Sequence, residues 1–436
     1  MQTSLETLGQ LERRLNVAVP LADIEAEVAK RLARLAKNVK IAGFRPGKVP
    51  MKMVAQQYGP QVRSEVISDT VQASFSDAVR EQQLRVAGYP RIEPRADAKA
   101  ADQLEFSAIF EVYPEIKLGD LSEVTIERPL ADVGPEDVAS TIEALRKQRV
   151  RYEAIDRPAA AGDRVIVDFT GRIDGVEFPG GQAKDFPITL GEGRMLPEFD
   201  AVLTGVRTGD TRAFPLTFPA DYHGKEVAGK TASFDLTVKS VAAAHLPTVD
   251  AEFARTFGVA SGRIEDLESE IEANLRLELK RKIEAKVKEQ ALAALRSKAE
   301  LALPRSLVEQ EAQSMAQRMA ADLKQQGMKE EDVKLTPEMF RAGAENRVAL
   351  GLVLGELVRR HGLQAKPEQV KALVQDAAQT YEQPEAVVRW HYENPERLAD
   401  FESLAVERNV VDWVLGQARV EDRMAKFSEL MTPPAS

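Results

Sequence analysis

The N-terminal part of the chain mixes two hydrophobic patterns. Apolar and polar residues tend to alternate over residues 11–19 and again over residues 104–113, and this period of two predicts β-strands. Between these segments, residues 21–39 carry apolar side chains at helical spacing. Those apolar positions are Ile24, Val28, Leu32, Leu35 and Val39. The pattern therefore predicts an amphipathic helix between two strands.

A second helix is predicted beyond a short loop. Its apolar spacing is compatible with a start at Lys52 or at Pro60, and it reaches Gln83. With the strands, the two helices predict a small α+β domain over residues 1–114, with the loop joining one helix to the other.

The pattern changes after this domain. Residues 115–150 are expected to form a connector that is extended at first and helical from Pro135, a residue suited to the first turn of a helix. Glycine is then frequent through residues 151–245, and apolar alternation is clear over residues 164–169 and 232–238. These features predict a compact β domain.

The remaining residues, 246–436, show helical periodicity. Residues 264–303 form one long and highly charged run whose apolar positions recur every three or four residues. Further helices are predicted from Pro304, before Gly362 and from about Pro367. This part of the chain is therefore expected to be helical throughout.

Composition narrows the function classes. The chain has 436 residues, no cysteine, and 69 acidic against 59 basic side chains. Its net charge of −10 argues against a general nucleic-acid coat or DNA binding, and no run of about 18 apolar residues predicts a membrane span. The N-terminus lacks a secretory signal pattern, so a cytoplasmic protein is expected. The four histidines lack metal-ligand spacing and no phosphate-binding loop occurs, so we expect no metal and no cofactor.

One region departs from this acidic average. No Asp or Glu occurs between Val28 and Ser64, a window that holds nine cations. They are Lys30, Arg31, Arg34, Lys37, Lys40, Arg45, Lys48, Lys52 and Arg63. Within it, residues 43–50 (GFRPGKVP) predict a tight exposed loop with Phe44 at its tip. The cations and the aromatic ring favour a docking tip for a polyanionic assembly over an ordinary solvated helix and turn.

This octapeptide resembles the signature loop of the trigger factor family, bacterial chaperones that dock beside the ribosomal exit tunnel. The resemblance implies ribosome binding through Gly43, Phe44, Arg45, Pro46, Gly47 and Lys48. The implied partners are a large-subunit protein and rRNA at the tunnel rim, together with nascent and unfolded polypeptides. A homodimer away from the ribosome is also implied.

Four motifs in the β domain place aromatic residues beside glycines and prolines. They are residues 168–171 (DFTG), 178–181 (FPGG), 191–199 (GEGRMLPEF) and 218–224 (FPADYHG). A short helix is predicted from Pro197 to about Leu203, with Phe199 on its inner face. The set resembles the FKBP-type prolyl isomerase domain over nearly all of residues 151–245.

The FKBP resemblance implies a shallow apolar pocket for an Xaa-Pro peptide. The implied catalytic residues are Phe169, Phe178, Met195, Leu196, Phe199, Tyr222 and Phe234, and the implied substrate-binding residues are Phe186 and His223. The sequence departs from the FKBP pattern at Phe199, where Trp is usual, at Glu198 in place of Gly, and at Pro179 in place of an acidic residue. The competing interpretation is that these aromatics only fill a β core.

Together, the resemblances imply a multidomain α+β protein. Its N-terminal α+β domain binds the ribosome, and its FKBP-like β domain is inserted between two parts of an elongated all-helical domain that holds polypeptide clients. The expected function is that of an ATP-independent chaperone with peptidyl-prolyl cis-trans isomerase activity. Alternatives are a free-standing FKBP-type isomerase, or a holdase scaffold, without ribosome binding.

Overall fold

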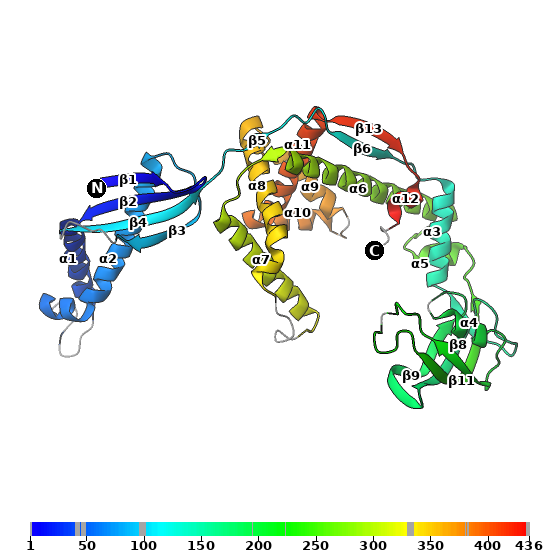
Figure 1. The fold of residues 1–436 in the computed structure, drawn as a ribbon. Coiled ribbons are helices and arrows are strands. Elements are labelled where there is room, and N and C mark those ends of the chain that lie inside the picture. Colours follow the sequence, from blue (N-terminus) through cyan, green and yellow to red (C-terminus); the bar gives the residue numbers. More distant parts are fainter. Residues whose placement is uncertain are drawn as a thin grey trace. The chain divides into compact units, whose positions relative to one another are not determined.

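The structure is a computed structural model (Figure 1). It describes residues 2–39, 44, 49–95, 102–193, 195–222, 224–328, 335–379, 381 and 383–432 of the chain. The chain divides into two units. The first comprises Met1–Arg128 and Ala285–Asp422, and the second comprises Pro129–Glu284 and Arg423–Ser436.

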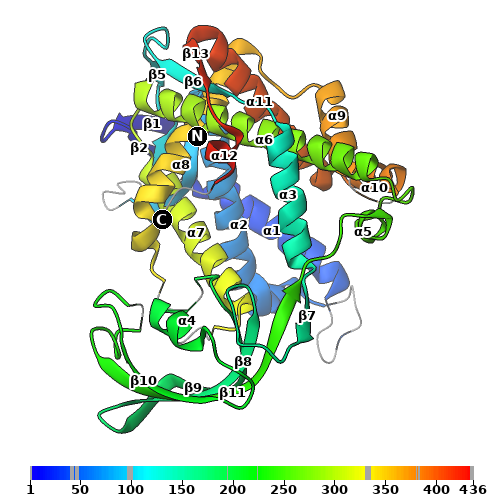
Figure 2. The ribbon, with the colours of Figure 1, turned by 90° about the vertical axis from the view of Figure 1, so that its right-hand side faces the viewer.

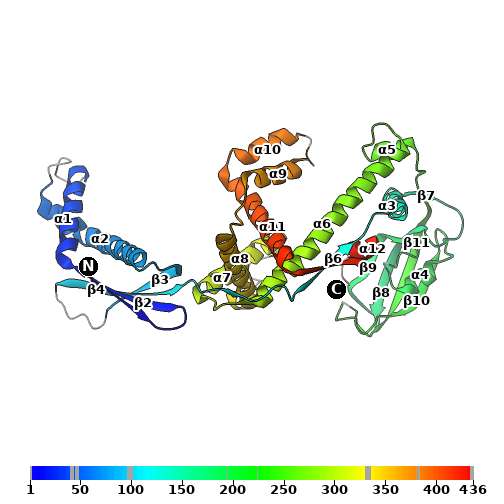
Figure 3. The ribbon, with the colours of Figure 1, turned by 90° about the horizontal axis from the view of Figure 1, so that it is seen from above.

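The first unit begins with a four-stranded antiparallel sheet in the order β1-β2-β4-β3. Two helices lie on one face of this sheet (Figures 1 and 3). The element bounds are β1 Gln2–Thr7, β2 Glu12–Pro20, α1 Leu21–Asn38, α2 Met51–Glu81, β3 Val86–Pro94 and β4 Gln103–Val112. The predicted strands over 11–19 and 104–113 and the predicted helix over 21–39 are therefore confirmed.

Burial explains where the helix α2 begins. Val54, in its first turn, is fully buried in the same core as Leu15 of β2 and Ile24 of α1. Because packing holds this turn in place, the helix starts at Met51 and Pro60 lies inside it. The predicted start at Lys52 is confirmed to within one residue, and the alternative start at Pro60 is wrong.

The second unit contains the β domain. Its five-stranded antiparallel sheet has the order β10-β11-β8-β9, with β7 paired to β11, and α4 lies against one face of the curved sheet (Figure 2). The bounds are β7 Arg151–Ala154, β8 Arg164–Ile173, β9 Val176–Thr189, α4 Pro197–Leu203, β10 Thr211–Thr217 and β11 Thr231–His245. Alternate residues of β8 and β11 are buried, as the predicted period of two requires.

The rest of the described chain is mostly helical. The helices are α3 Pro135–Gln148, α5 Ala251–Thr256, α6 Ile264–Lys298, α7 Arg305–Gln325, α8 Arg341–His361, α9 Pro367–Ala378, α10 Pro384–Tyr392, α11 Ala399–Gln417 and α12 Phe427–Met431, with 3-10 turns η2 Pro337–Phe340 and η3 Pro395–Leu398. Two short strand pairs interrupt them. These join β5 Lys117–Leu118 to β12 Ala299–Glu300, and β6 Thr125–Leu130 to β13 Arg419–Met424.

These helices form small separate cores. In the first unit, Val308 and Ala312 of α7 pack against Ala344 of α8. In the second unit, Ile142 of α3 packs with Leu267 of the first part of α6. No helix in the described part of the chain is both long enough and apolar enough to cross a membrane.

Candidate functional site

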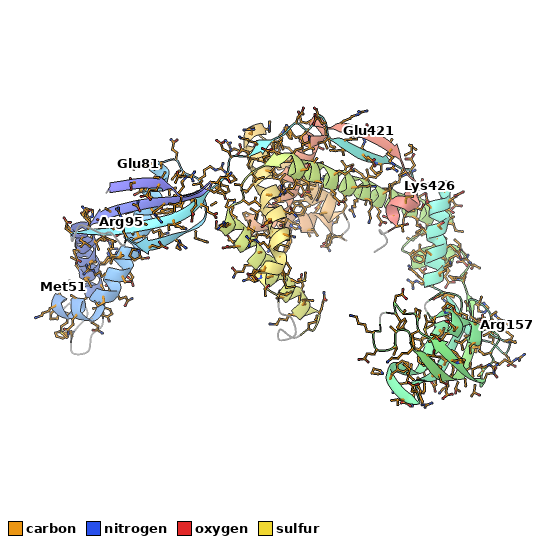
Figure 4. All side chains as sticks on the ribbon, in the orientation of Figure 1. Met51, Glu81, Arg95, Arg157, Glu421 and Lys426 are labelled. Carbon is orange, nitrogen blue, oxygen red and sulfur yellow. The ribbon has the colours of Figure 1, made fainter. Side chains whose placement is uncertain are left out.

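The first candidate site lies where α1 is joined to α2. Phe44 is 38% exposed there, and Met51 and Met53 in the first turn of α2 are 45% and 40% exposed. Val49, between them in sequence, is buried. Met51 lies at one end of α2 and Glu81 at the other (Figure 4). The chain therefore exposes large apolar side chains at this end of the helical pair.

Five of the six residues predicted to bind the ribosome cannot be placed. Gly43, Arg45, Pro46, Gly47 and Lys48 lie outside the described residues. For Phe44, the prediction of an exposed ring is confirmed.

Several cations of the acid-free stretch between Val28 and Ser64 form ion pairs with carboxylates from outside that stretch. Arg31 pairs with Asp69 at 2.7 Å, Arg63 with Glu25 at 2.8 Å, and Lys30 with Glu27 at 3.1 Å. All three carboxylates lie just outside the acid-free window.

The hydrogen bond from Arg31 to Asp69 raises the pKa of that guanidinium above its usual value. By contrast, Arg34, Lys37 and Lys52 are exposed and have no ion pair with a described residue. Among the described residues of this window, these three side chains thus carry positive charge that no ion pair compensates.

The second candidate site is a cavity of about 450 Å³ in the β domain. It is lined by Phe169, Phe178, Pro179, Gly180, Gly193, Met195, Leu196, Phe199, Phe218, Tyr222, Gly224, Val227 and Phe234. All seven residues predicted to be catalytic are in this set. The fold therefore brings together, in one cavity, side chains that are spread over 66 positions of sequence.

Edge-to-face ring contacts fix the cavity floor. Phe199 of α4 has its ring centroid 5.1 Å from Phe234 of β11 and 5.8 Å from Phe169 of β8, at interplanar angles of 72° and 70°. Such perpendicular pairs stabilise an aromatic cluster beyond the burial of its area. Phe199 is only 3% exposed, so its position at the base of the cavity is well constrained.

The start of α4 supplies a polar group to the cavity, the backbone N–H of Leu196. Pro197 occupies the first turn, and the carbonyl of Leu196 accepts a hydrogen bond from the backbone N–H of Phe199 at 2.9 Å. No described residue accepts a hydrogen bond from the backbone N–H of Leu196. Apart from the Tyr222 hydroxyl, no ionisable side chain of a described residue lines the cavity. The cavity is thus suited to binding an apolar peptide rather than to attack by a nucleophile.

Three family models match stretches of the chain, two of them from the bacterial trigger factor protein and one from the FKBP-type isomerase. The model of the bacterial trigger factor protein matches residues 1–145, that of its C-terminus matches residues 263–416, and that of the FKBP-type peptidyl-prolyl cis-trans isomerase matches residues 156–239. Trigger factor of Aromatoleum aromaticum is 52% identical over 431 residues, which cover 99% of each chain. The chain belongs to the trigger factor family. Trigger factor of Nitrosospira multiformis is 51% identical over 432 residues, again 99% of each chain.

Within this family assignment, the chain is a trigger factor chaperone with a ribosome-binding N-terminal domain and an FKBP-type isomerase domain in the middle. Members of the family bind ribosomes and nascent chains. One solved structure of the trigger factor chaperone aligns with 96% of this chain and 100% of its own, at 19% identity and a TM-score of 0.48. At that similarity it adds no weight, and the assignment rests on the sequence relatives.

Of the two predicted substrate-binding residues, only Phe186 is among the described residues. The ring of Phe186 on β9 contacts Phe169 edge-to-face at 5.8 Å, but Phe186 does not line the cavity and is 37% exposed. His223 lies outside the described residues. Neither residue's predicted contact with substrate is tested by the fold.

Six residues that line the cavity were not among the predicted site residues: Pro179, Gly180, Gly193, Phe218, Gly224 and Val227. Phe218 follows β10 and lies 4.9 Å from the ring of Tyr222, and Val227 lies in the turn before β11. Phe218 stands four positions before Tyr222 in the same motif, and this spacing could have indicated it. Val227 carries no distinctive pattern in the sequence.

Proposed function

We propose that the β-domain cavity catalyses cis/trans isomerisation of Xaa-Pro bonds in polypeptides held near the ribosome. The observation that carries this proposal is the convergence of seven predicted residues on one uncharged cavity. Rotation about the peptide bond faces a barrier of about 18–20 kcal/mol that comes from C–N resonance. An aromatic cavity that excludes water disfavours the charge-separated planar amide.

The same cavity suggests a role for each part. Phe199 forms the floor for the proline ring, and the backbone N–H of Leu196 donates a hydrogen bond to the substrate carbonyl while the bond twists. The Tyr222 hydroxyl contacts the peptide backbone. Phe186 and His223 contact the flanking substrate residues. Pro179 replaces one polar contact of the FKBP pattern, so recognition depends mainly on apolar contact.

The exposed end of the helical pair is the proposed ribosome contact. Residues 43–48 dock at the exit tunnel, where Phe44 inserts as an apolar anchor into a large-subunit protein. Arg45 and Lys48, together with nearby uncompensated cations, attract rRNA phosphates. The exposure of Phe44 and the absence of described ion pairs at Arg34 and Lys37 support this assignment.

The remaining parts serve the chaperone role. We assign residues 1–114 to ribosome binding, 151–245 to isomerisation, and 246–436, joined through the connector 115–150, to holding unfolded polypeptides without ATP. The protein acts in the cytoplasm, where nascent chains emerge, and forms a homodimer when it is away from the ribosome.

Two assays on one variant test this function. Alanine at Phe44, Arg45 and Lys48 should abolish co-sedimentation with ribosomes while leaving isomerisation of a proline peptide unchanged, because the two sites lie in different units. Arg63→Ala, which removes a cation paired with Glu25, is the control for docking. Ribosome binding by the triple variant would contradict docking, and a wild-type rate equal to the uncatalysed rate would contradict the isomerase role.

A further inference from the structure

Two glycines provide the space that two cavity rings occupy. If Gly181 carried a Cβ, that atom would lie 2.8, 2.9 and 3.0 Å from Cζ, Cε1 and Cε2 of Phe178. A Cβ on Gly171 would lie 2.6 and 2.7 Å from Cε1 and Cζ of Phe234. Such distances are far inside van der Waals contact, so each ring lies where a side chain of its glycine would be.

Strand register explains how these contacts arise. Gly171 on β8 is the direct cross-strand partner of Phe234 on β11, so the Phe234 ring covers it. On the other side of β8, Arg172 pairs with Glu177 and Thr170 pairs with Gln182. The residues between those two pairs, 178–181, therefore bulge out of β9 opposite Gly171, and the Phe178 ring folds back over Gly181.

The two rings differ in their freedom to move. Phe234 is 3% exposed and packs against the rings of Phe169, Phe199 and Phe214. Phe178 is half-buried and meets only Phe218 and Phe234 among the described rings, edge-to-face at 6.0 and 6.3 Å. A methyl group on Gly171 would thus press on a fixed ring, whereas one on Gly181 would displace a movable ring that forms the cavity wall.

We propose that Gly181 is a positioning residue for the isomerase reaction, because its missing side chain seats the Phe178 ring in the cavity wall. The inference rests on the proposed isomerase function. Gly181 does not have the positive φ that would itself disfavour alanine, since it is absent from the described residues with left-handed backbone. The three atoms nearest to its added Cβ all belong to Phe178, so the ring is the obstacle that an alanine meets.

A double-mutant cycle tests this proposal. Gly181→Ala should lower kcat/KM for a proline peptide about tenfold, since small misplacements of a binding wall have large kinetic effects. It should leave the melting temperature nearly unchanged, because the half-buried Phe178 can rotate. In a Phe178→Leu background, Gly181→Ala should have no further effect, because leucine has no atoms at the Cε and Cζ positions.

Controls separate positioning from general damage. Lys184→Ala, an exposed change on the same strand, should match the wild type in rate and stability. Gly171→Ala should instead lower the melting temperature, because Phe234 cannot move aside.

Other results would overturn either the positioning role of Gly181 or the isomerase function itself. The same loss from Gly181→Ala in the wild-type and Phe178→Leu backgrounds, an unchanged rate, or an unfolded Gly181→Ala variant would overturn the proposal. A wild type without turnover would contradict the isomerase function itself, and is thereby distinguished from a failure of this inference.

Discussion

The Glu111 carboxylate accepts hydrogen bonds from the backbone N–H of Ser306 at 2.8 Å and from the Ser306 hydroxyl at 2.7 Å. Its other oxygen accepts the backbone N–H of Arg305 at 2.9 Å. Helix α7 begins here, and Pro304 at its N-cap position has no side-chain oxygen to offer. A residue of strand β4 therefore caps a helix that starts almost two hundred positions later.

We predict that Glu111→Gln loosens the start of α7. Glutamine keeps one acceptor oxygen but turns an NH₂ donor toward a backbone N–H, so one of the capping bonds is lost. Loss of a cap costs about 1 kcal/mol, and amide hydrogen exchange in the first turn of α7 should accelerate accordingly. Glu115→Gln, at an exposed position, is the matched control. Equal exchange in Glu111→Gln and wild type would show that the cap does not stabilise the helix.

The β domain contains an ion pair between a buried carboxylate, Asp163, and an exposed guanidinium, Arg157, and this pair should respond to pH. Asp163 is 4% exposed and accepts two hydrogen bonds from Arg157, at 2.6 and 3.0 Å, and one from the backbone N–H of Ala160 at 2.8 Å. The bonds from Arg157 hold the pKa of Asp163 below its usual value, although burial acts to raise it. A lowered folded-state pKa contributes stability above the unfolded pKa, and this is lost as pH falls through the folded value.

Asp163→Asn should therefore lower the free energy of unfolding of the β domain at neutral pH by about 2 kcal/mol. It should also remove part of the fall in stability below about pH 4, the usual pKa range of aspartate. The measurement is urea unfolding at a series of pH values from neutral to acidic, with amide hydrogen exchange in β8 as the readout for the β domain. A variant with the same pH dependence as wild type would assign the acid sensitivity to other groups.

Cations of α1 and α2 with and without ion pairs can be compared for their effect on ribosome binding. Arg34 and Lys37 lack ion pairs with described residues, whereas Lys30 and Arg63 pair with Glu27 and Glu25. We expect alanine at Arg34 and Lys37 to weaken ribosome binding more than alanine at Lys30 and Arg63, because the second pair is already compensated locally. The check is ribosome pelleting of both double variants at one salt concentration. Equal loss from the two variants would show that the ion pairs do not direct binding.

Local patterns predicted much of the fold. The apolar spacing of residues 21–39 predicted α1 correctly because a helix with one buried face requires such spacing. Ile24, Val28 and Leu32 are all buried. The cavity residues were predicted through the resemblance of four motifs to the FKBP-type isomerase domain, and Pro197 begins α4 as expected from the sequence.

Other features depend on contacts that no local pattern specifies. Asp69 lies 38 positions after Arg31, and nothing in the sequence indicates that α1 and α2 bring the two within 2.7 Å. The same holds for Glu111, which in sequence is an ordinary polar position of a strand. The start of α2 at Met51 rather than Pro60 also depended on tertiary burial, in this case of Val54.

The salt dependence of ribosome binding tests the central claim most directly. Each phosphate contact contributes about 0.7 to 0.9 to the slope of log affinity against log salt. Pelleting across a salt series should therefore show a steep slope for wild type and a shallower one for Arg45→Ala with Lys48→Ala. Phe44→Ala should weaken binding at every salt concentration with the wild-type slope. Wild-type affinity and slope in both variants would contradict docking through this loop.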